Sequence, residues 1–379
     1  MEKTINECFF QIQNGANIKQ GDVEGGFPIT RIETTANDKF NRDRMGYAGI
    51  TDISKYEAYV LEDGDLLMSH INSVQYLGRT VLYIKQPDEI IIHGMNLLRL
   101  KARRNIINPA YARYCFYGHT FRCQIGNITK KSVNQASFAV KDLKQIKIEV
   151  PSLDVQNKVV VILDRVQKLI DMRNNELASL DDLIKARFVE MFGNPVINEK
   201  RWRQKSLGEI TTKIGSGATP KGGKGAYQEE GITLIRSMNV HNGLFEYKEL
   251  AHISDEQATK LDNVVIEEND VLLNITGASV ARSCVVPSKI LPARVNQHVC
   301  IIRCKKCINP EFLNKLLIDD NYQDLLWSIA GAGATREAIT KQQVENLQII
   351  MPPIELQIEF MRFCNQVNKS KFGKLSTLL

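Results

Sequence analysis

The residues that come nearest to a catalytic pattern lie between Gly217 and Gly225, Gly-Ala-Thr-Pro-Lys-Gly-Gly-Lys-Gly. A nucleotide-binding P-loop requires Gly-Lys-Ser/Thr at a fixed distance from its first glycine, whereas here Lys224 comes one place late and Gly225 follows it. A basic, glycine-rich loop can still lie against a polyanion, because small residues let backbone N–H groups approach phosphates. A plain surface turn explains the stretch equally well.

Other near-matches to catalytic or metal motifs are incomplete. Met351-Pro352-Pro353-Ile354 lacks both flanking residues of the Asn-Pro-Pro-aromatic motif of amino-methyltransferases, and its prolines are typical of the start of a helix. Cys304-Lys305-Lys306-Cys307 has no second cysteine pair at zinc-site spacing. The six histidines form no paired metal-binding spacing. The sequence therefore predicts neither an enzyme nor a metal site.

Polar segments with interleaved aromatic residues are more informative. Asn and Gln suit adenine, Arg suits guanine, and Ser, Thr and Lys suit phosphates. Candidate nucleic-acid contacts in the first half are Arg31, Asn37, Lys39, Asn41, Arg42, Arg44, Tyr47, Lys130, Lys131, Asn134 and Gln135. Those in the second half are Thr219, Lys221, Lys224, Tyr227, Arg236, Asn239, Asn242, Thr335 and Arg336. For any one of them, a solvated surface position remains the simpler interpretation.

Composition bounds the class of protein. The 379 residues are enough for two or three domains, and 43% hydrophobic and 24% charged residues are ordinary for a globular protein. The net charge of +6 permits nucleic-acid binding without requiring it. No apolar run is long enough to cross a membrane, and the eight cysteines have no framework spacing. We expect a cytoplasmic protein with no membrane partner.

The chain repeats itself. Matched segments occur in the same order in both halves, at offsets between 201 (309 − 108) and 205 (236 − 31). They are Ile12–Ala16 with Ile214–Ala218, Phe27–Arg31 with Ile232–Arg236, Asp63–Leu67 with Glu268–Leu272, Gly78–Thr80 with Ala281–Ser283, Ile107–Pro109 with Ile308–Pro310, and Pro151–Gln156 with Pro352–Gln357. The drift in offset indicates loop insertions after a duplication.

Each repeat is predicted to be a globular domain followed by a helix. The expected parts are a domain over 1–150, a helix over 151–193, a second domain over 194–352 and a shorter helix over 353–379. Short apolar runs predict strands over 65–68, 79–84 and 90–92, and Asn108 and Asn309 cap helices that open with proline. The fold class is α+β.

The helix over 151–193 organises this architecture. Its apolar positions alternate steps of three and four, which is the seam of a coiled coil and needs a partner helix. Arg173 and Arg187 interrupt the seam, and Gly193 ends the helix, which rises about 54 Å. A long core helix with no other role is the alternative.

The second helix supplies the partner. We expect the two helices to run antiparallel, with the domains at opposite ends and related by a pseudo-two-fold axis. The second helix is about fifteen residues shorter (193 − 178), which predicts that the seam near Leu180, Ile184 and Met191 is uncovered. The residues expected to form the spacer or to bind partners are Leu163, Val166, Ile170, Leu177, Leu180, Ile184, Met191, Phe360 and Val367.

The chain resembles the specificity subunits of type I restriction-modification systems over essentially its whole length. The residues that carry the resemblance are Gly217, Thr219, Pro220 and Tyr227, the element ending at Arg31, the strands at Asp65 and Asp270, the helix starts at Pro151 and Pro352, and the helix end Ala186–Pro195. The Phe-Gly-Asn-Pro end together with the duplication is the specific part of this likeness.

The resemblance implies a non-catalytic subunit that reads double-stranded DNA. Two target recognition domains would each read one half of a split, asymmetric sequence, and the helices would set the gap. Two modification subunits would bring S-adenosylmethionine to methylate adenine, and restriction subunits would add ATP- and magnesium-dependent translocation and cleavage, so this chain needs no cofactor of its own. The alternatives are a coiled-coil scaffold with two ligand-binding domains and, less favoured, a self-contained nuclease.

Overall fold

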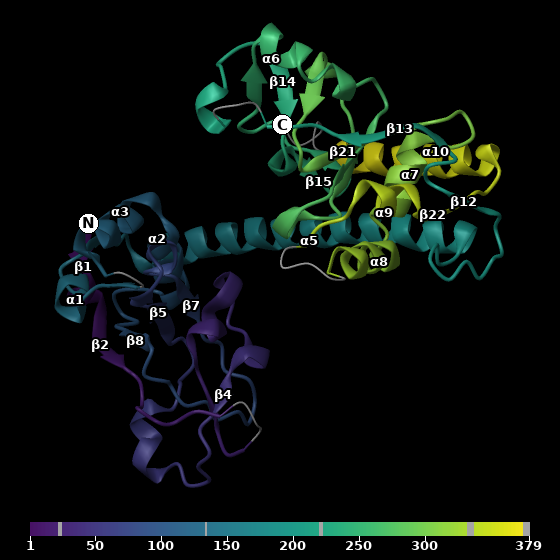
Figure 1. The fold of residues 1–379 in the computed structure, drawn as a ribbon. Helices are drawn as coiled ribbons and strands as arrows, with labels where there is room; N and C mark the ends of the chain where they lie inside the picture. The colour runs from purple at the N-terminus through teal and green to yellow at the C-terminus, as the bar shows by residue number, and fades with distance from the viewer. Residues whose placement is uncertain (22–24, 133–134, 220–222, 332–336, 374–379) are drawn as a thin grey trace. The chain divides into compact units, whose positions relative to one another are not determined.

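The computed structural model describes residues 1–21, 25–132, 135–219, 223–331 and 337–373 (Figure 1). Asn134, Lys221, Thr335 and Arg336 lie outside these residues, and the side chain of Lys224 is not described. The chain forms two compact units, Met1–Met172 and Arg173–Leu379, whose boundary falls inside the longest helix, α5 (Leu153–Phe192).

The first unit is built on a four-stranded antiparallel sheet of order β2-β8-β5-β7. Its strands are β2 (Phe9–Asn14), β8 (Leu97–Ala102), β5 (Leu66–Ser69) and β7 (Thr80–Leu82). The smaller pairings join β1 (Glu2–Thr4) to β11 (Lys147–Glu149), β10 (Ala136–Ser137) to β6 (Ile71–Asn72) and β9 (Lys130–Lys131), and β3 (Pro28–Ile29) to β4 (Gly46–Tyr47). The helices are α1 (Ile5–Cys8), α2 (Pro109–Tyr117), α3 (His119–Ile128) and α4 (Val140–Leu143).

The second unit repeats this plan. Its four-stranded sheet has the order β13-β21-β18-β19, with β13 (Thr211–Ser216), β21 (Val299–Cys304), β18 (Val271–Asn274) and β19 (Ser283–Val285). The other strands are β12 (Gln204–Ser206), β14 (Ile232–Ile235), β15 (Val240–His241), β16 (Leu244–Phe245), β17 (Ala251–Ile253), β20 (Ala293–Val295) and β22 (Gln348–Ile350). The helices are α6 (Asp255–Thr259), α7 (Pro310–Leu317), α8 (Asp320–Gly331), α9 (Lys341–Glu345) and α10 (Ile354–Gly373).

A buried glutamine confirms the repeat at the level of single atoms. The Asn108 backbone N–H donates to Oε1 of Gln156 at 2.8 Å, and the Asn309 N–H donates to Oε1 of Gln357 at 2.9 Å. Both glutamine side chains are 0% exposed, and each ties the start of a short helix to the start of a long one. Asn108 and Asn309 also cap α2 and α7 with their own side chains, as predicted.

The predicted strand over 90–92 is wrong. Ile91 and Ile92 are buried, but Ile92 forms only isolated bridges, to Ile29 and to Val60. Each bridge joins Ile92 to one residue only, so the continuous ladder of hydrogen bonds that defines a strand does not form here. The apolar run reports burial here and not strand formation.

Within the second unit, the C-terminal half of α5 packs antiparallel against α10, as the sequence predicts (Figure 1). Phe188 lies 5.5 Å from Phe360 between ring centroids, whereas Lys371, further along α10, pairs with Asp181, further back along α5. Both arginines of the seam form contacts between α5 and α10. Arg173 donates to the Lys371 carbonyl at 2.5 Å, and Arg187 contacts Glu359 at 3.4 Å.

The expected position of the uncovered seam is wrong. Ile184 is buried, and Leu180 and Met191 pack against the same core cluster, which includes Phe312 of the second domain and Phe360 of α10. This end of α5 is thus covered both by α10, through Phe360, and by the second domain, through Phe312. Gly193, with φ of 74°, ends the helix in the left-handed conformation expected of a C-terminal glycine.

Most of the exposed large apolar side chains of α5 lie in the part that belongs to the first unit. We call six of them the α5 stripe: Val161, Ile162, Val166, Leu169, Ile170 and Met172. Val155 near the start of the helix is also exposed, as are Leu183 and Val189 in the second unit. Leu169 is 65% exposed and Ile162 59%. The spacer positions Val166 and Ile170 therefore lie open in this chain, and Leu163 and Leu177 are half-buried.

Candidate nucleic-acid interface

A buried ion pair fixes the central strands of each domain. Asp65 precedes β5 and pairs with Arg99 of β8 at 2.6 Å, and Asp270 precedes β18 and pairs with Arg303 of β21 at 2.8 Å. Burial raises the pKa of Asp65, which the hydrogen bonds from the Glu62 backbone and Arg99 oppose. Each carboxylate also accepts a hydrogen bond from the backbone N–H of the residue three positions before it, Glu62 or Glu267. The aspartates recognised in the repeat are therefore structural.

The repeated arginines Arg31 and Arg236 open equivalent turns. The backbone N–H of Arg31 donates to Thr34 Oγ1 at 2.8 Å, and that of Arg236 donates to Asn239 Oδ1 at 3.1 Å. The Arg31 side chain holds Gln20 at 2.9 Å, while the Arg236 guanidinium lies over the ring of Tyr227 at 5.4 Å. The turns shape the edge of each domain beside a cleft.

The first cleft has a volume of about 400 Å³. The turn after Arg31, the segment Asn17–Gln20 and the loop before β8 line it. Glu33, Met95 and Asn96 are exposed at its mouth. The cleft combines a carboxylate, amides and an arginine, which are groups able to contact base edges.

The second cleft is larger, about 1090 Å³. It is lined by the turn after Arg236, the segment Thr276–Ser279, Arg282 and His298, and also by Gly331, Glu337 and Ala338. Nδ1 of His298 lies 2.5 Å from Thr276 Oγ1, and its Nε2 lies 3.3 Å from the Gln297 amide nitrogen. These contacts hold the ring in place at the cleft wall. The His298 loop directly precedes β21, just as the Asn96 loop directly precedes β8.

An arginine distinguishes the two clefts. Arg79 precedes β7 and pairs with Asp38 at 2.8 Å, also lying 4.6 Å over the ring of Tyr76. Its counterpart Arg282 precedes β19 and lines the second cleft, where its nearest polar partner is His241 at 3.5 Å. Among the described residues, no carboxylate lies within ion-pairing distance of Arg282. This guanidinium can therefore bind an incoming phosphate or guanine.

Several predicted contact residues have structural roles instead. The Asn41 amide donates to backbone carbonyls, including that of Ala36 at 2.6 Å. Arg42 forms a bidentate ion pair with Glu89, with N–O distances of 2.7 and 2.9 Å. Asn239 is 0% exposed, and its amide is bound to the carbonyls of its own loop. We leave these three residues out of the proposed contact set.

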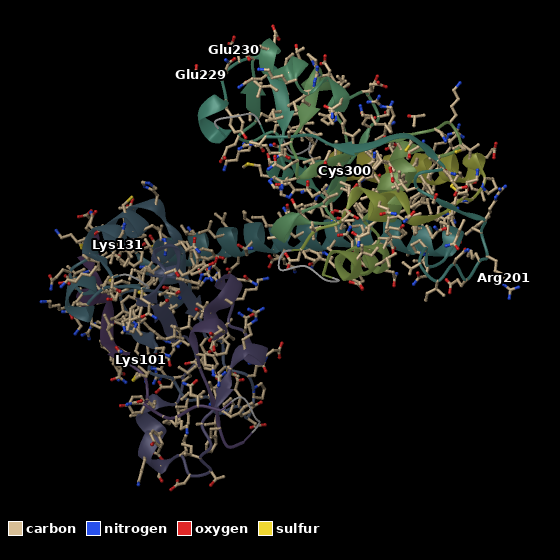
Figure 2. The ribbon with its side chains drawn as sticks, in the orientation of Figure 1. Lys101, Lys131, Arg201, Glu229, Glu230 and Cys300 are labelled. Carbon is tan, nitrogen blue, oxygen red and sulfur yellow. The ribbon has the colours of Figure 1, made fainter. Side chains whose placement is uncertain are left out.

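The remaining described candidates are accessible to different degrees. Exposed side chains belong to Asn37, Lys39, Arg44, Lys130, Lys131, Gln135 and Asn242. Figure 2 places Lys131 at the surface of the first unit. Lys39 contacts Asp171 of α5 at 3.3 Å, and Asn242 contacts Gln323 at 3.3 Å. Tyr47, Thr219 and Tyr227 are half-buried, and Thr219 is hydrogen-bonded to Gln297.

The cleft residues Glu33, Asn96, His298 and Arg282 were not predicted. A signal for two of them exists in the sequence, because Asn96 and His298 occupy the same place in the repeat. Within the described ranges there is no cluster of three or more potential metal ligands. Nor is any helix of the described chain long and apolar enough to span a bilayer.

Comparison with known proteins identifies the class. A sequence model of the type I restriction modification DNA specificity domain matches residues 2–181 and 199–374. The chain therefore belongs to this family, and it is a DNA specificity subunit of a type I restriction-modification system, a subunit without catalytic activity of its own.

One named relative is similar to this chain in sequence, and two solved structures share its fold. The chain is 29% identical over 378 residues to a Methanocaldococcus jannaschii protein whose name describes a type I restriction enzyme MjaX specificity subunit, covering 94% of this chain and 83% of the relative. Its fold matches a chain from a structure of type I restriction-modification complex assembly and conformational transition (TM-score 0.57, 17% identity, 98% and 91% coverage). It also matches the S subunit from M. genitalium (TM-score 0.56, 13% identity, 100% and 92% coverage).

Proposed function

We propose that this chain reads one bipartite, asymmetric DNA sequence, and that each domain reads one half of it. The observation that carries the proposal is the pair of clefts, which share two lining elements of the repeat, the turn after the repeated arginine and the loop before a central strand, and present different side chains on them. A duplicated scaffold that keeps Gln156 and Gln357 in identical roles, yet changes the cleft, fits recognition of two unlike half-sequences.

The spacer helix sets the distance between the halves in this proposal. A helix of 40 residues is about 60 Å long, and one turn of DNA is about 34–36 Å. A continuous helix is stiff enough to fix a gap of defined length between two reading sites.

The partners proposed are two modification subunits that methylate adenine with S-adenosylmethionine, and restriction subunits that use ATP and magnesium. The α5 stripe is the surface proposed for modification subunits, because contiguous exposed apolar side chains mark protein contact sites. Exposed cations such as Arg44, Lys130 and Lys131 would contact phosphates. A DNA target of this kind places the complex in the cytoplasm.

The test is selection from a pool of random-sequence duplexes by the chain assembled with its modification subunits. The proposal expects enrichment of two different short sequences at one fixed spacing, with binding that weakens steeply as salt rises. Enrichment of a single uninterrupted sequence, or of none, would refute it.

A further inference from the structure

Two positions recur at the mouth of both clefts. The first directly precedes a central strand and holds Asn96 before β8 and His298 before β21. The loops match in their hydrogen bonding, since the Leu97 N–H donates to Gly94 and the Val299 N–H donates to Asn296, both at 3.4 Å. The same backbone frame thus presents an amide in one domain and an imidazole in the other.

The second position lies in the turn that follows the repeated arginine. It holds Glu33 in the first domain and Met238 in the second, each two residues after Arg31 or Arg236. Both side chains are exposed and line their cleft, and Met238 is 40% exposed. An acidic group is replaced here by an apolar one on an equivalent turn.

We infer that these two positions select bases, with Asn96 and Glu33 acting on one half-sequence and His298 and Met238 on the other. The inference rests on the proposed function, because it assigns base reading to side chains of the clefts. Phosphate binding is left to the basic residues around them.

The chemistry of the four side chains fits reading of base edges. The Asn96 amide can donate to N7 and accept from the N6 amino group of adenine when suitably rotated, and the Glu33 carboxylate can accept from the N4 amino group of cytosine. The Met238 side chain is apolar, as is suited to the thymine methyl group. Thr276 holds Nδ1 of His298, and Nε2 can bind a base edge if it exchanges its 3.3 Å contact with the Gln297 amide for one with the base.

The surroundings of Asn96 and Glu33 favour this role over a structural one. Both side chains are exposed, and neither forms a hydrogen bond with the described residues of the chain. By contrast, the amides of Asn41 and Asn239 are fully used by backbone carbonyls. A polar side chain that the fold leaves unused at a cleft mouth is free to bind a ligand.

The experiment compares the wild-type complex with variants of the same complex in selection from random-sequence duplexes. Asn96→Ala should relax one base position of one half-sequence, with discrimination falling about tenfold to 100-fold. His298→Ala should relax a position in the other half only. Asn96→Asp keeps the shape of the side chain, but a carboxylate only accepts hydrogen bonds. This variant should therefore change the preferred base rather than abolish the preference.

Controls separate the possible failures. Lys55→Ala changes an exposed residue outside both clefts and should leave the selected sequence unchanged. Circular dichroism and co-purification with the modification subunits establish that each variant is folded and assembled. A wild-type complex that selects no split sequence would refute the proposed function itself. A split sequence that all the cleft variants retain, or that they weaken equally for every base, would overturn the inference alone.

Discussion

Two buried histidines should make the first unit sensitive to mild acid. His93 is 0% exposed and His70 5%, and neither Nδ1 has a hydrogen-bond partner among the described residues. Nε2 of His93 donates to the Leu97 carbonyl at 2.9 Å, so a second proton would enter at the unpartnered Nδ1. Burial accordingly lowers the pKa of His70 to about 4 and that of His93 to about 3, from 6.5.

The sign and size of the effect follow by linkage. Because the pKa is lower in the folded state, the unfolded chain binds the proton first, and the stabilisation present above pH 6.5 is lost as pH falls through that value. At pH 5 the contribution of each histidine to the free energy of unfolding has fallen by about 2 kcal/mol, since one pH unit corresponds to about 1.36 kcal/mol. The loss depends mainly on the unfolded pKa, because both folded values lie below pH 5.

The assay is urea unfolding at pH 7 and pH 5, followed by circular dichroism and by tryptophan fluorescence. Trp202 and Trp327 are the two tryptophans of the chain and both lie in the second unit, so a transition without a fluorescence change reports the first unit. For the wild-type chain, the free energy of unfolding of the first unit should be about 4 kcal/mol lower at pH 5 than at pH 7.

The variant H70Q/H93Q should lose most of this pH dependence whatever its absolute stability, since glutamine does not titrate and can still donate to the Leu97 carbonyl. Most carboxylates ionise below pH 5, so the chosen window isolates the histidines. An undiminished pH effect in the double variant would refute the reasoning.

Three further outcomes are expected. Phe360→Ala removes a ring that is 0% exposed and should destabilise the second unit by about 3–5 kcal/mol in the fluorescence transition, whereas Leu244→Ala, at a side chain 61% exposed, should cost less than about 1 kcal/mol; similar losses for both would contradict the packing described. The hydrogen bond from Arg42 lowers the pKa of Glu89 to about 2, so its stabilisation is present above pH 4.5 and is lost as pH falls from 4.5 towards 2. Glu89→Gln should weaken that acid dependence in circular dichroism of the first unit, and an unchanged acid profile would argue against the ion pair. Inserting seven residues between 163 and 170 lengthens the helix by about 10 Å and should widen the unread gap in the selected sequence by about three base pairs without altering either half; an unchanged gap would rule out the spacer role.

The architecture was largely predictable because it depends on local and repeated signals. Asn-Pro at Asn108 and Asn309, the glutamines Gln156 and Gln357, and the glycine Gly193 each act through short-range hydrogen bonds or backbone conformation. A duplicated sequence shows each of these signals twice. The pairing of α5 with α10 followed from the same periodic seam.

The covering of individual side chains was not predictable in this way. The seam pattern is the same at Ile170 and Ile184, yet one side chain is 48% exposed and the other 6%. The difference comes from residues far away in sequence, such as Phe312, which pack on the C-terminal end of the helix. Periodicity identifies an apolar face but not what covers it.

The clefts escaped prediction for a related reason. Asn41 and Arg42 look like nucleic-acid contacts by residue type, but the fold uses them internally. Asn96 and His298 carry no distinctive motif and become notable only because equivalent loops place each of them at a cleft. Aligning the two repeats position by position, rather than searching for polar clusters, would have pointed to both.

The central claim is that the two domains read two different half-sequences at a fixed spacing. Its most direct test is methylation sequencing of a host genome after this chain is expressed with its modification subunits. We expect adenine methylation at one split, non-palindromic sequence with a constant gap. Methylation at an uninterrupted or palindromic sequence, or at no defined sequence, would contradict it.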